Sequence, residues 1–207
     1  ETRLWTIATR SIIGANTAFK IKNKSFSLMF EEAFSQLNLN WDMFNREYCY
    51  SFVLQHPSNK IVTLIKEPNL YLTDVFKIED YKIYSIDFRN QECFSELLKY
   101  VSVPKQYDEE TSLDSIKLKY CSMNTSFDIM GIMFKNGFYR YKMRNPVYEY
   151  LHNLKGNEPK LQYQYYSLRK NNQVYDFLKH YPEYKDEFGK LRQELHNVTA
   201  QLWRNYI

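Results

Sequence analysis

Hydrophobic residues recur along the chain with two periods, and each period predicts a different kind of element. Within residues 25–39, Phe26, Phe30, Phe34 and Leu37 are spaced by three or four positions, with acidic residues between them. This spacing predicts an amphipathic helix, because side chains three or four apart lie on the same helix face. An aromatic stripe of this kind is typical of packing, so we expect it to cover a sheet rather than to bind a cofactor.

Alternation of apolar and polar residues predicts the strands. It occurs in residues 4–8, twice within residues 48–62, and again in residues 70–78 and 82–88. A polar turn that begins at His56 and contains proline and asparagine separates the two runs of the second segment. We expect this histidine to be exposed, as turn histidines usually are.

Helical spacing is found in one short segment in the middle of the chain and throughout its last third. Residues 95–101, 161–170 and 174–179 are candidate short helices, and residues 104–114 read as a polar surface loop with solvated acidic residues. A longer helix is expected after Pro182. Its apolar residues form a single stripe: Phe188, Leu191, Leu195, Val198, Leu202 and Tyr206.

The stretch from Met130 to Tyr148 carries the clearest candidate chemistry. Its first part alternates in the manner of strands and contains Asn136 followed by glycine, which is typical of a tight turn, so a β-hairpin is expected. Lys142 and Arg144 stand two positions apart on the second strand and therefore share one face. Two cations aimed at one point can hold a phosphate chain. For a K-x-R pair taken alone, an ordinary solvated strand face is the alternative.

Composition and charge narrow the class of protein. A chain of 207 residues suits one large domain, with or without a smaller appendage. With 19 tyrosines, 14 phenylalanines and only 5 glycines, it is typical of a folded, aromatic-rich domain rather than a disordered tail. The net charge of +4 is unevenly placed, because residues 135–170 hold eight basic and two acidic residues. This basic segment favours a polyanion as partner, either a nucleotide or a nucleic acid.

Cysteine usage and hydropathy indicate in which cellular compartment the protein is expected. The three cysteines, Cys49, Cys93 and Cys121, are odd in number and form no CxxC, so neither a disulfide framework nor a zinc site is expected. No apolar run approaches the roughly 20 residues of a membrane span, and the first residues do not resemble a signal peptide. We therefore expect a cytoplasmic protein without membrane contact, and no protein partner is inferred.

The hairpin stretch resembles the fourth and fifth signature motifs of the covalent nucleotidyltransferases, most closely those of RNA ligases of the bacteriophage and large-virus type. In that family, E-G-hydrophobic-V precedes a short turn, K-x-K and a tyrosine. Residues 131–133 match the first part, Lys142 and Arg144 match the second, and Tyr148 stands at the tyrosine. The resemblance implies that Lys142 and Arg144 are catalytic residues holding the nucleotide's α-phosphate, and that Tyr148 serves RNA binding or ligation.

Two earlier segments resemble further motifs, in the family's order. Phe52 and residues 57–62 match the third motif, F-E-F-V followed by P-x-N-R-I-V. Residues 5–11 match the strand that delivers a lysine or arginine toward the nucleotide, with Arg10 at that position. The resemblance implies that Arg10 and Phe52 are nucleotide-binding residues, with Phe52 or a neighbouring aromatic side chain placed against the adenine.

The chain departs from the family at three points. Met130 stands where the family has a metal-binding glutamate, and Val53 stands where it has a ribose-contacting glutamate, so no metal ligand is assigned. The motif K-x-D-G, which supplies the lysine nucleophile, does not occur in the chain. If the resemblance holds, that lysine lies before Glu1 and was cut away or was never present; the abrupt start at a strand-like segment leads us to expect a missing upstream piece.

The implied reaction is ATP-dependent joining of RNA ends, with ATP and Mg²⁺ as cofactors. A lysine attacks the α-phosphate of ATP, the AMP passes to an RNA 5′-phosphate, and a 3′-hydroxyl displaces it. A virus-encoded enzyme acting in the host cytoplasm would fit this family. The alternative is a degenerate relative that binds nucleotide or RNA and joins nothing. A capping guanylyltransferase or a DNA ligase of the same superfamily is a third reading, against which the helical tail counts.

The resemblance implies an α+β fold, in which an antiparallel-sheet, ATP-grasp-like nucleotidyltransferase core encloses a nucleotide cleft. The pattern of elements gives the same class without the family. Residues 1–150 would form the core and residues 151–207 a small helical subdomain. Tyrosines in residues 163–166, beside Arg169 and Lys170, offer a further way to grip single-stranded RNA by stacking.

Overall fold

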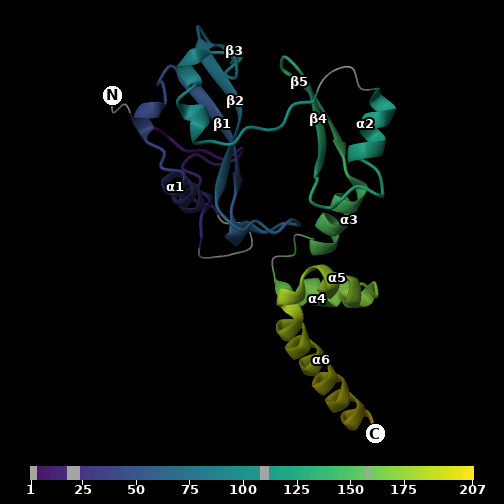
Figure 1. The fold of residues 1–207 in the computed structure, drawn as a ribbon. Helices are drawn as coiled ribbons and strands as arrows, with labels where there is room; N and C mark the ends of the chain where they lie inside the picture. Colours follow the sequence, from purple (N-terminus) through teal and green to yellow (C-terminus); the bar gives the residue numbers. More distant parts are fainter. Residues whose placement is uncertain (1–3, 18–23, 108–111, 157, 159) are drawn as a thin grey trace.

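The fold of the chain is α+β, with two small antiparallel sheets and six α-helices in the described residues (Figure 1). The computed structural model describes residues 4–17, 24–107, 112–156, 158 and 160–207. The elements in chain order are α1 (Phe26–Gln36), β1 (Tyr48–Gln55), β2 (Asn69–Glu79), β3 (Lys82–Ile86), α2 (Leu113–Tyr120), β4 (Gly131–Asn136), β5 (Tyr139–Arg144), α3 (Pro146–Lys155), α4 (Leu161–Lys170), α5 (Val174–His180) and α6 (Lys185–Tyr206). Strands β1-β2-β3 form one sheet, and β4-β5 form a separate hairpin.

The first hydrophobic core lies between α1 and one face of the three-stranded sheet (Figure 1). The hydroxyl of Ser25 caps α1 by accepting a hydrogen bond from the backbone N–H of Leu28 (3.2 Å). Phe30 and Phe34, from the aromatic stripe of the helix, join this core, and Phe34 stacks on Trp41 with ring centroids 4.4 Å apart. The expected structural role of the stripe is therefore confirmed.

A β-bulge in the middle of β2 decides which side chains face this core. Ser51 of β1 pairs with Asp74, and the ladder then shifts so that Thr73 is left without a partner. Because successive side chains alternate between the two faces, the extra residue lets Leu72 and Val75 both point into the core. It also directs Asp74 to the opposite face of the sheet.

The second hydrophobic core is helical and lies among α3, α4, α5 and the start of α6. Its buried members are Val62, Tyr148, Leu151, Leu154, Tyr165, Leu168, Phe177, Tyr181 and Phe188. Polar contacts tie it to the segment after β1: the Tyr181 hydroxyl lies 3.1 Å from the carbonyl oxygen of Ile61, and Lys60 forms an ion pair with Glu183 (2.8 Å). The expected division after residue 150 stays a prediction; the buried members of this core are Val62 and residues from Tyr148 onward.

Several expected elements differ from the structure. Residues 4–8 form no strand, and only an isolated bridge joins Ala8 to Ile13. The run at 60–62 is not a strand either, because Val62 is drawn into the helical core. The expected helix at 95–101 is reduced to one 3₁₀ turn, Leu97–Lys99. Helix α2 was not expected, and the acidic residues 108–110 of the predicted loop lie outside the described residues.

The C-terminal helices agree with their pattern, but the last one is only partly packed. Helix α6 contains the expected stripe, and its first member, Phe188, is buried. Leu202, Trp203 and Tyr206 near its other end are exposed, and the helix extends away from the rest of the molecule (Figure 1). None of the helices in the described ranges is both long enough and apolar enough to cross a membrane.

Candidate functional site

The candidate site is built on the β4–β5 hairpin. The strands pair from Gly131 with Arg144 to Asn136 with Tyr139, so the connecting loop is Gly137 and Phe138, one residue later than the sequence suggested. Gly137 has φ of +56°, which a two-residue hairpin turn requires of its first residue. Gly131 also has a positive φ, and a Cβ there would collide with the carbonyl oxygen of Met143.

The hairpin has one face toward α2 and one cationic face. Ile132, Phe134 and Met143 share the first face, and the Cys121 thiol at the end of α2 donates a hydrogen bond to the carbonyl oxygen of Met143 (3.3 Å). The register places four basic residues on the other face: Lys135, Arg140, Lys142 and Arg144. The expectation that Lys142 and Arg144 share a face is therefore confirmed, and two further cations lie beside them.

Two of these cations contact the three-stranded sheet through one buried carboxylate. The ammonium of Lys135 forms an ion pair with Oδ1 of Asp74, and the guanidinium of Arg140 lies 3.0 Å from Oδ2. The Asp74 side chain is 5% exposed, whereas those of Lys135 and Arg140 are 38% and 41% exposed. The cationic face of the hairpin is thus the face that meets β2. Both cations belong to the basic segment 135–170, whereas no local pattern distinguishes Asp74.

The other two cations are exposed and differ in their partners. Arg144 forms an ion pair with Glu149 of α3, at 2.6 Å between nitrogen and oxygen. Lys142 is exposed and forms no hydrogen bond or ion pair with another described residue. Of the cationic face, Lys142 is therefore the side chain whose charge is left for a ligand.

Asn145 fixes the end of β5 and the start of α3. Its side chain is fully buried, and its amide donates hydrogen bonds to the carbonyl oxygens of Ser126 and Ile129, both at 2.8 Å. Its amide oxygen accepts a hydrogen bond from the backbone N–H of Val147 (2.9 Å) and so caps α3, in which Pro146 occupies the first turn. Because all of these groups are satisfied, Arg144 is presented at a well-defined position.

Arg10 and Phe52 do not join the hairpin residues. Arg10 lies on an exposed turn, where Thr9 Oγ1 accepts a hydrogen bond from the N–H of Ile12 (3.1 Å). Phe52 packs in the aromatic core, with its ring centroid 6.0 Å from that of Phe30. Phe52 therefore lies on the core face of β1, whereas Ser51, which pairs with Asp74, lies on the opposite face. Both nucleotide-binding roles stay predictions, and Phe52 has a packing role that the resemblance did not anticipate.

Tyr148 is a core residue of the helical cluster rather than a surface residue. It lies in the first turns of α3 on the same side as Leu151, its side chain is buried, and burial raises the pKa of its hydroxyl above the ordinary value. Tyr148 follows β5 by four residues, and strand alternation does not decide its direction there. Its expected role in RNA binding or ligation stays a prediction, now with a structural role beside it.

The two positions that lack the family's glutamates are both on the surface. Met130 precedes β4 and Val53 lies on β1, and both side chains are exposed. No group of three or more histidine, cysteine or acidic side chains suited to a metal occurs in the described part of the chain. A thioether is also a poor ligand for magnesium. Neither Met130 nor Val53 offers an oxygen ligand, and the expectation of Mg²⁺ as a cofactor stays a prediction.

His56 is buried, contrary to expectation. Its Nδ1 accepts a hydrogen bond from the N–H of Ser58 (3.0 Å), so its Nε2 carries the proton that faces Glu32 at 2.8 Å. Glu32 also contacts Lys24, and the hydrogen bond from Lys24, followed by that from His56, lowers the pKa of the carboxyl below its ordinary value. The histidine therefore closes the turn after β1 against α1.

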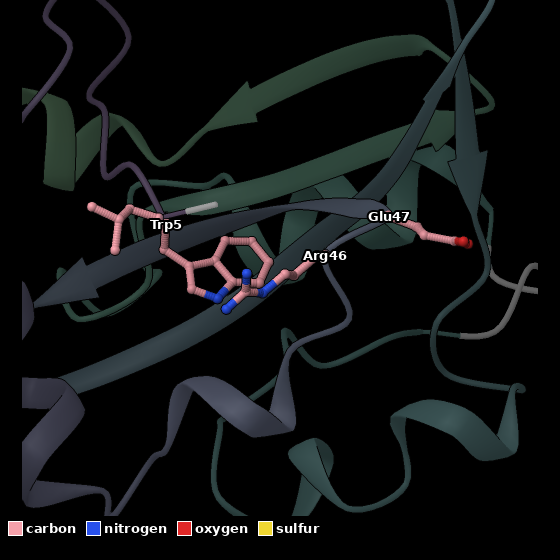
Figure 2. A pocket seen from close by; sticks show the side chains of 4 residues that line it. Trp5, Arg46 and Glu47 are labelled. Atoms are coloured by element: carbon pink, nitrogen blue, oxygen red, sulfur yellow. The ribbon is translucent and has the colours of Figure 1, made fainter. Parts of the chain in front are cut away.

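A hollow of about 520 Å³ lies away from the hairpin and is lined by Leu4, Trp5, Arg46 and Glu47 (Figure 2). The indole N–H of Trp5 is buried and has no hydrogen-bond partner among the described residues, while the Glu47 carboxylate points away from the indole (Figure 2). Trp5 packs on Tyr50, whose side chain belongs to the core face of β1. The hollow is thus on the side of the sheet opposite to Asp74.

Comparisons with known proteins leave the resemblance resting on the motifs alone. No family model matches the chain, and a search of curated proteins gave no match either. The geometry of the hairpin is therefore what bears on function. It places Lys142 and Arg144 on one face, and it leaves Arg10 of the N-terminal motif apart from them.

Proposed function

We propose that the chain is an RNA ligase-type nucleotidyltransferase domain that holds the phosphates of an adenylate and an RNA end on the cationic face of the β4–β5 hairpin. The observation that carries the proposal is the placement of Lys142. It lies on the same face as Arg144, Lys135 and Arg140, and of these four it is the exposed cation without an ionic partner in the described residues. Fixed cations stabilise the negative charge that builds up on a pentavalent phosphorus.

The step within reach of these residues is the last one of the implied reaction. The 3′-hydroxyl oxygen of one RNA attacks the 5′-phosphorus of an adenylylated RNA, and a phosphodiester bond forms. The bond from that phosphorus to the bridging oxygen breaks, AMP leaves with the electron pair, and the hydroxyl proton passes to solvent. This step needs no lysine nucleophile, so the absence of K-x-D-G from the sequence does not preclude it.

A second function is favoured by the two missing carboxylates. Met130 and Val53 offer no oxygen ligand where the resembling family has glutamate. A domain with the phosphate-binding face but without these carboxylates would bind nucleotide or RNA and join nothing. Both readings predict binding, and they differ in whether a phosphodiester bond is formed.

The test supplies the chain with pre-adenylylated RNA. The 207-residue protein, an RNA with a 5′-adenylate and an RNA with a free 3′-hydroxyl are incubated in magnesium buffer, and the joined product is followed on a denaturing gel. We expect joining by the unsubstituted chain and a loss of at least tenfold in Lys142→Ala. Lys190→Ala, which removes an exposed lysine of α6, is the matched control.

The outcomes separate the two functions. Joining that depends on Lys142 supports the ligase. Binding of the adenylylated RNA that depends on Lys142, without any joined product, replaces the ligase by the binding function. If Lys142→Ala both joins and binds RNA as the unsubstituted chain does, the cationic face is not the phosphate site and both functions are wrong.

A further inference from the structure

The hairpin and the three-stranded sheet contact each other through charge rather than through apolar packing. No residue of β4 or β5 belongs to either hydrophobic cluster of the described chain. Among the side-chain hydrogen bonds and ion pairs of the described residues, those that join the hairpin to β2 are the two ion pairs of Asp74, with Lys135 and with Arg140. The polar link between the cationic face and the sheet therefore runs through a single carboxylate.

The sheet contains a specific device that presents this carboxylate. Without the bulge at Thr73, residues 72 and 74 would point to the same face, and Asp74 would be directed into the aromatic core beside Leu72. The hydroxyl of Thr73 donates a hydrogen bond to the carbonyl oxygen of Ser51 (3.1 Å), which closes the bulge across the two strands. Bulges of this kind redirect a side chain at one point of a ladder.

Burial makes the carboxylate dependent on its two partners. A buried carboxylate loses hydration, and that loss must be offset by paired cations. Lys135 and Arg140 are these two cations. They stand opposite each other in the register, so the carboxylate of Asp74 is paired with one residue from each strand of the hairpin. A single carboxylate thus fixes both β4 and β5.

We propose that Asp74 is a positioning residue, which holds the hairpin against β2 and engages two of its four cations so that Lys142 is left for the substrate phosphate. The proposal rests on the proposed function for the identity of that phosphate, but the position of the hairpin is independent of it. In this arrangement Lys135 and Arg140 set the place of the hairpin, and Lys142 provides its available charge.

The first experiment measures the position of the hairpin directly. Spin labels are attached at Tyr81→Cys, beyond β2, and at Tyr139→Cys, at the start of β5, in a chain whose three native cysteines are replaced by serine. Both tyrosines are exposed, so the labels disturb no core. In Asp74→Asn we expect the distance distribution to broaden and shift to longer distances. Asp114→Asn, at an exposed position of α2, should leave it unchanged.

Asp74→Asn is expected to fold, because the two cations that it frees are about 40% exposed and can be hydrated. Circular dichroism and thermal unfolding check this. Should the variant be unfolded, Arg140→Gln gives the same measurement, since it removes one of the two ion pairs and keeps the carboxylate paired with Lys135. An unchanged distance distribution in a folded Asp74→Asn chain overturns the proposal.

The second experiment measures RNA binding and RNA joining in Asp74→Asn. Loss of a positioning role should strengthen the salt dependence of binding, whereas loss of general stability should weaken binding. Freed from Asp74, Lys135 and Arg140 become available to any polyanion. The salt dependence of binding to single-stranded RNA should then steepen, by up to about 1.4 in the slope of log K against log salt for two added cations. Joining of pre-adenylylated RNA should fall at least tenfold in the same variant, because the face is misplaced.

The combinations of results are decisive. A steeper salt dependence of RNA binding, together with reduced joining, supports the positioning role. A loss of both RNA binding and joining would show that Asp74 serves general stability, and it would overturn the proposal. If the unsubstituted chain joins and binds nothing, the proposed function fails, yet the label distances still decide whether Asp74 holds the hairpin.

Discussion

The three-stranded sheet and the hairpin are both antiparallel, but different forces hold them in place. The sheet is covered by α1 on one face, and its central strand contributes Leu70, Leu72 and Val75, all with 0% exposure. In the hairpin, three of the six residues of β4 and five of the six residues of β5 are exposed, and none is buried. It is held by ion pairs to Asp74, by a thiol hydrogen bond from Cys121 and by Asn145.

This difference in packing places the stability of the fold in the sheet core and the candidate function on the hairpin. A surface built on apolar burial is rigid, and its residues are costly to change. A hairpin held by a few polar contacts can carry charged residues whose loss affects binding more than folding.

The largest effect is expected in the sheet core. Leu72→Ala should lower the free energy of unfolding by about 3 kcal/mol, because it removes buried methyl groups and leaves a cavity. Urea denaturation measures this. Met133→Ala, at an exposed position of β4, should change the free energy by less than about 0.5 kcal/mol. Equal costs at the two positions would show that the hairpin is as tightly packed as the sheet.

A smaller effect is expected at the polar anchor of the hairpin. Asn145→Ala should cost about 2 kcal/mol, because it leaves the carbonyl oxygen of Ile129 without its donor, removes one of the two donors to the carbonyl oxygen of Ser126, and removes the cap of α3. Hydrogen exchange should show faster opening of β5 than of β2. Asn153→Ala, at an exposed position of α3, should be neutral. If β2 opens as much as β5, the two regions are not independent.

The smallest effect concerns the link between the sheet region and the helical core. Burial acts to raise the pKa of Glu183, but the hydrogen bond from Lys60 and the nearby positive charges outweigh it, so the pKa lies below its ordinary value of 4.5. A carboxyl whose pKa is lower in the folded state stabilises the fold above the unfolded pKa, and this contribution is lost as the pH falls through the folded value.

Glu183→Gln should therefore lower thermal stability at pH 6 to 7, by less than about 1 kcal/mol because the pair is partly exposed to solvent. The difference from the unsubstituted chain should shrink as the pH falls below 4.5 and through the lowered pKa of the folded state, where the native carboxyl is protonated. Glu194→Gln, an exposed change on α6, serves as control at each pH. A difference that persists at pH 3 would assign the effect to packing instead of charge.

Local periodicity determined most of the elements. Helix α1, strands β2 and β3, the hairpin and helices α4 to α6 lie close to where their patterns place them, because each pattern reflects a face that must be buried or solvated. The cationic pair Lys142 and Arg144 could also be placed on one face, since strand alternation alone decides it. Short segments without a sustained period, such as residues 4–8, could not be assigned in this way.

Only the tertiary structure decided what each face meets. Whether Phe52 or Val53 faces α1 depends on the sheet's orientation, and the burial of Tyr148 depends on helices that follow it in the chain. The role of Asp74 depends on a one-residue register shift and on partners 61 and 66 positions away. Such contacts are long-range in sequence, so no local pattern contains them. Which cations remain available to a ligand is therefore known only when the ion pairs of the folded chain are known.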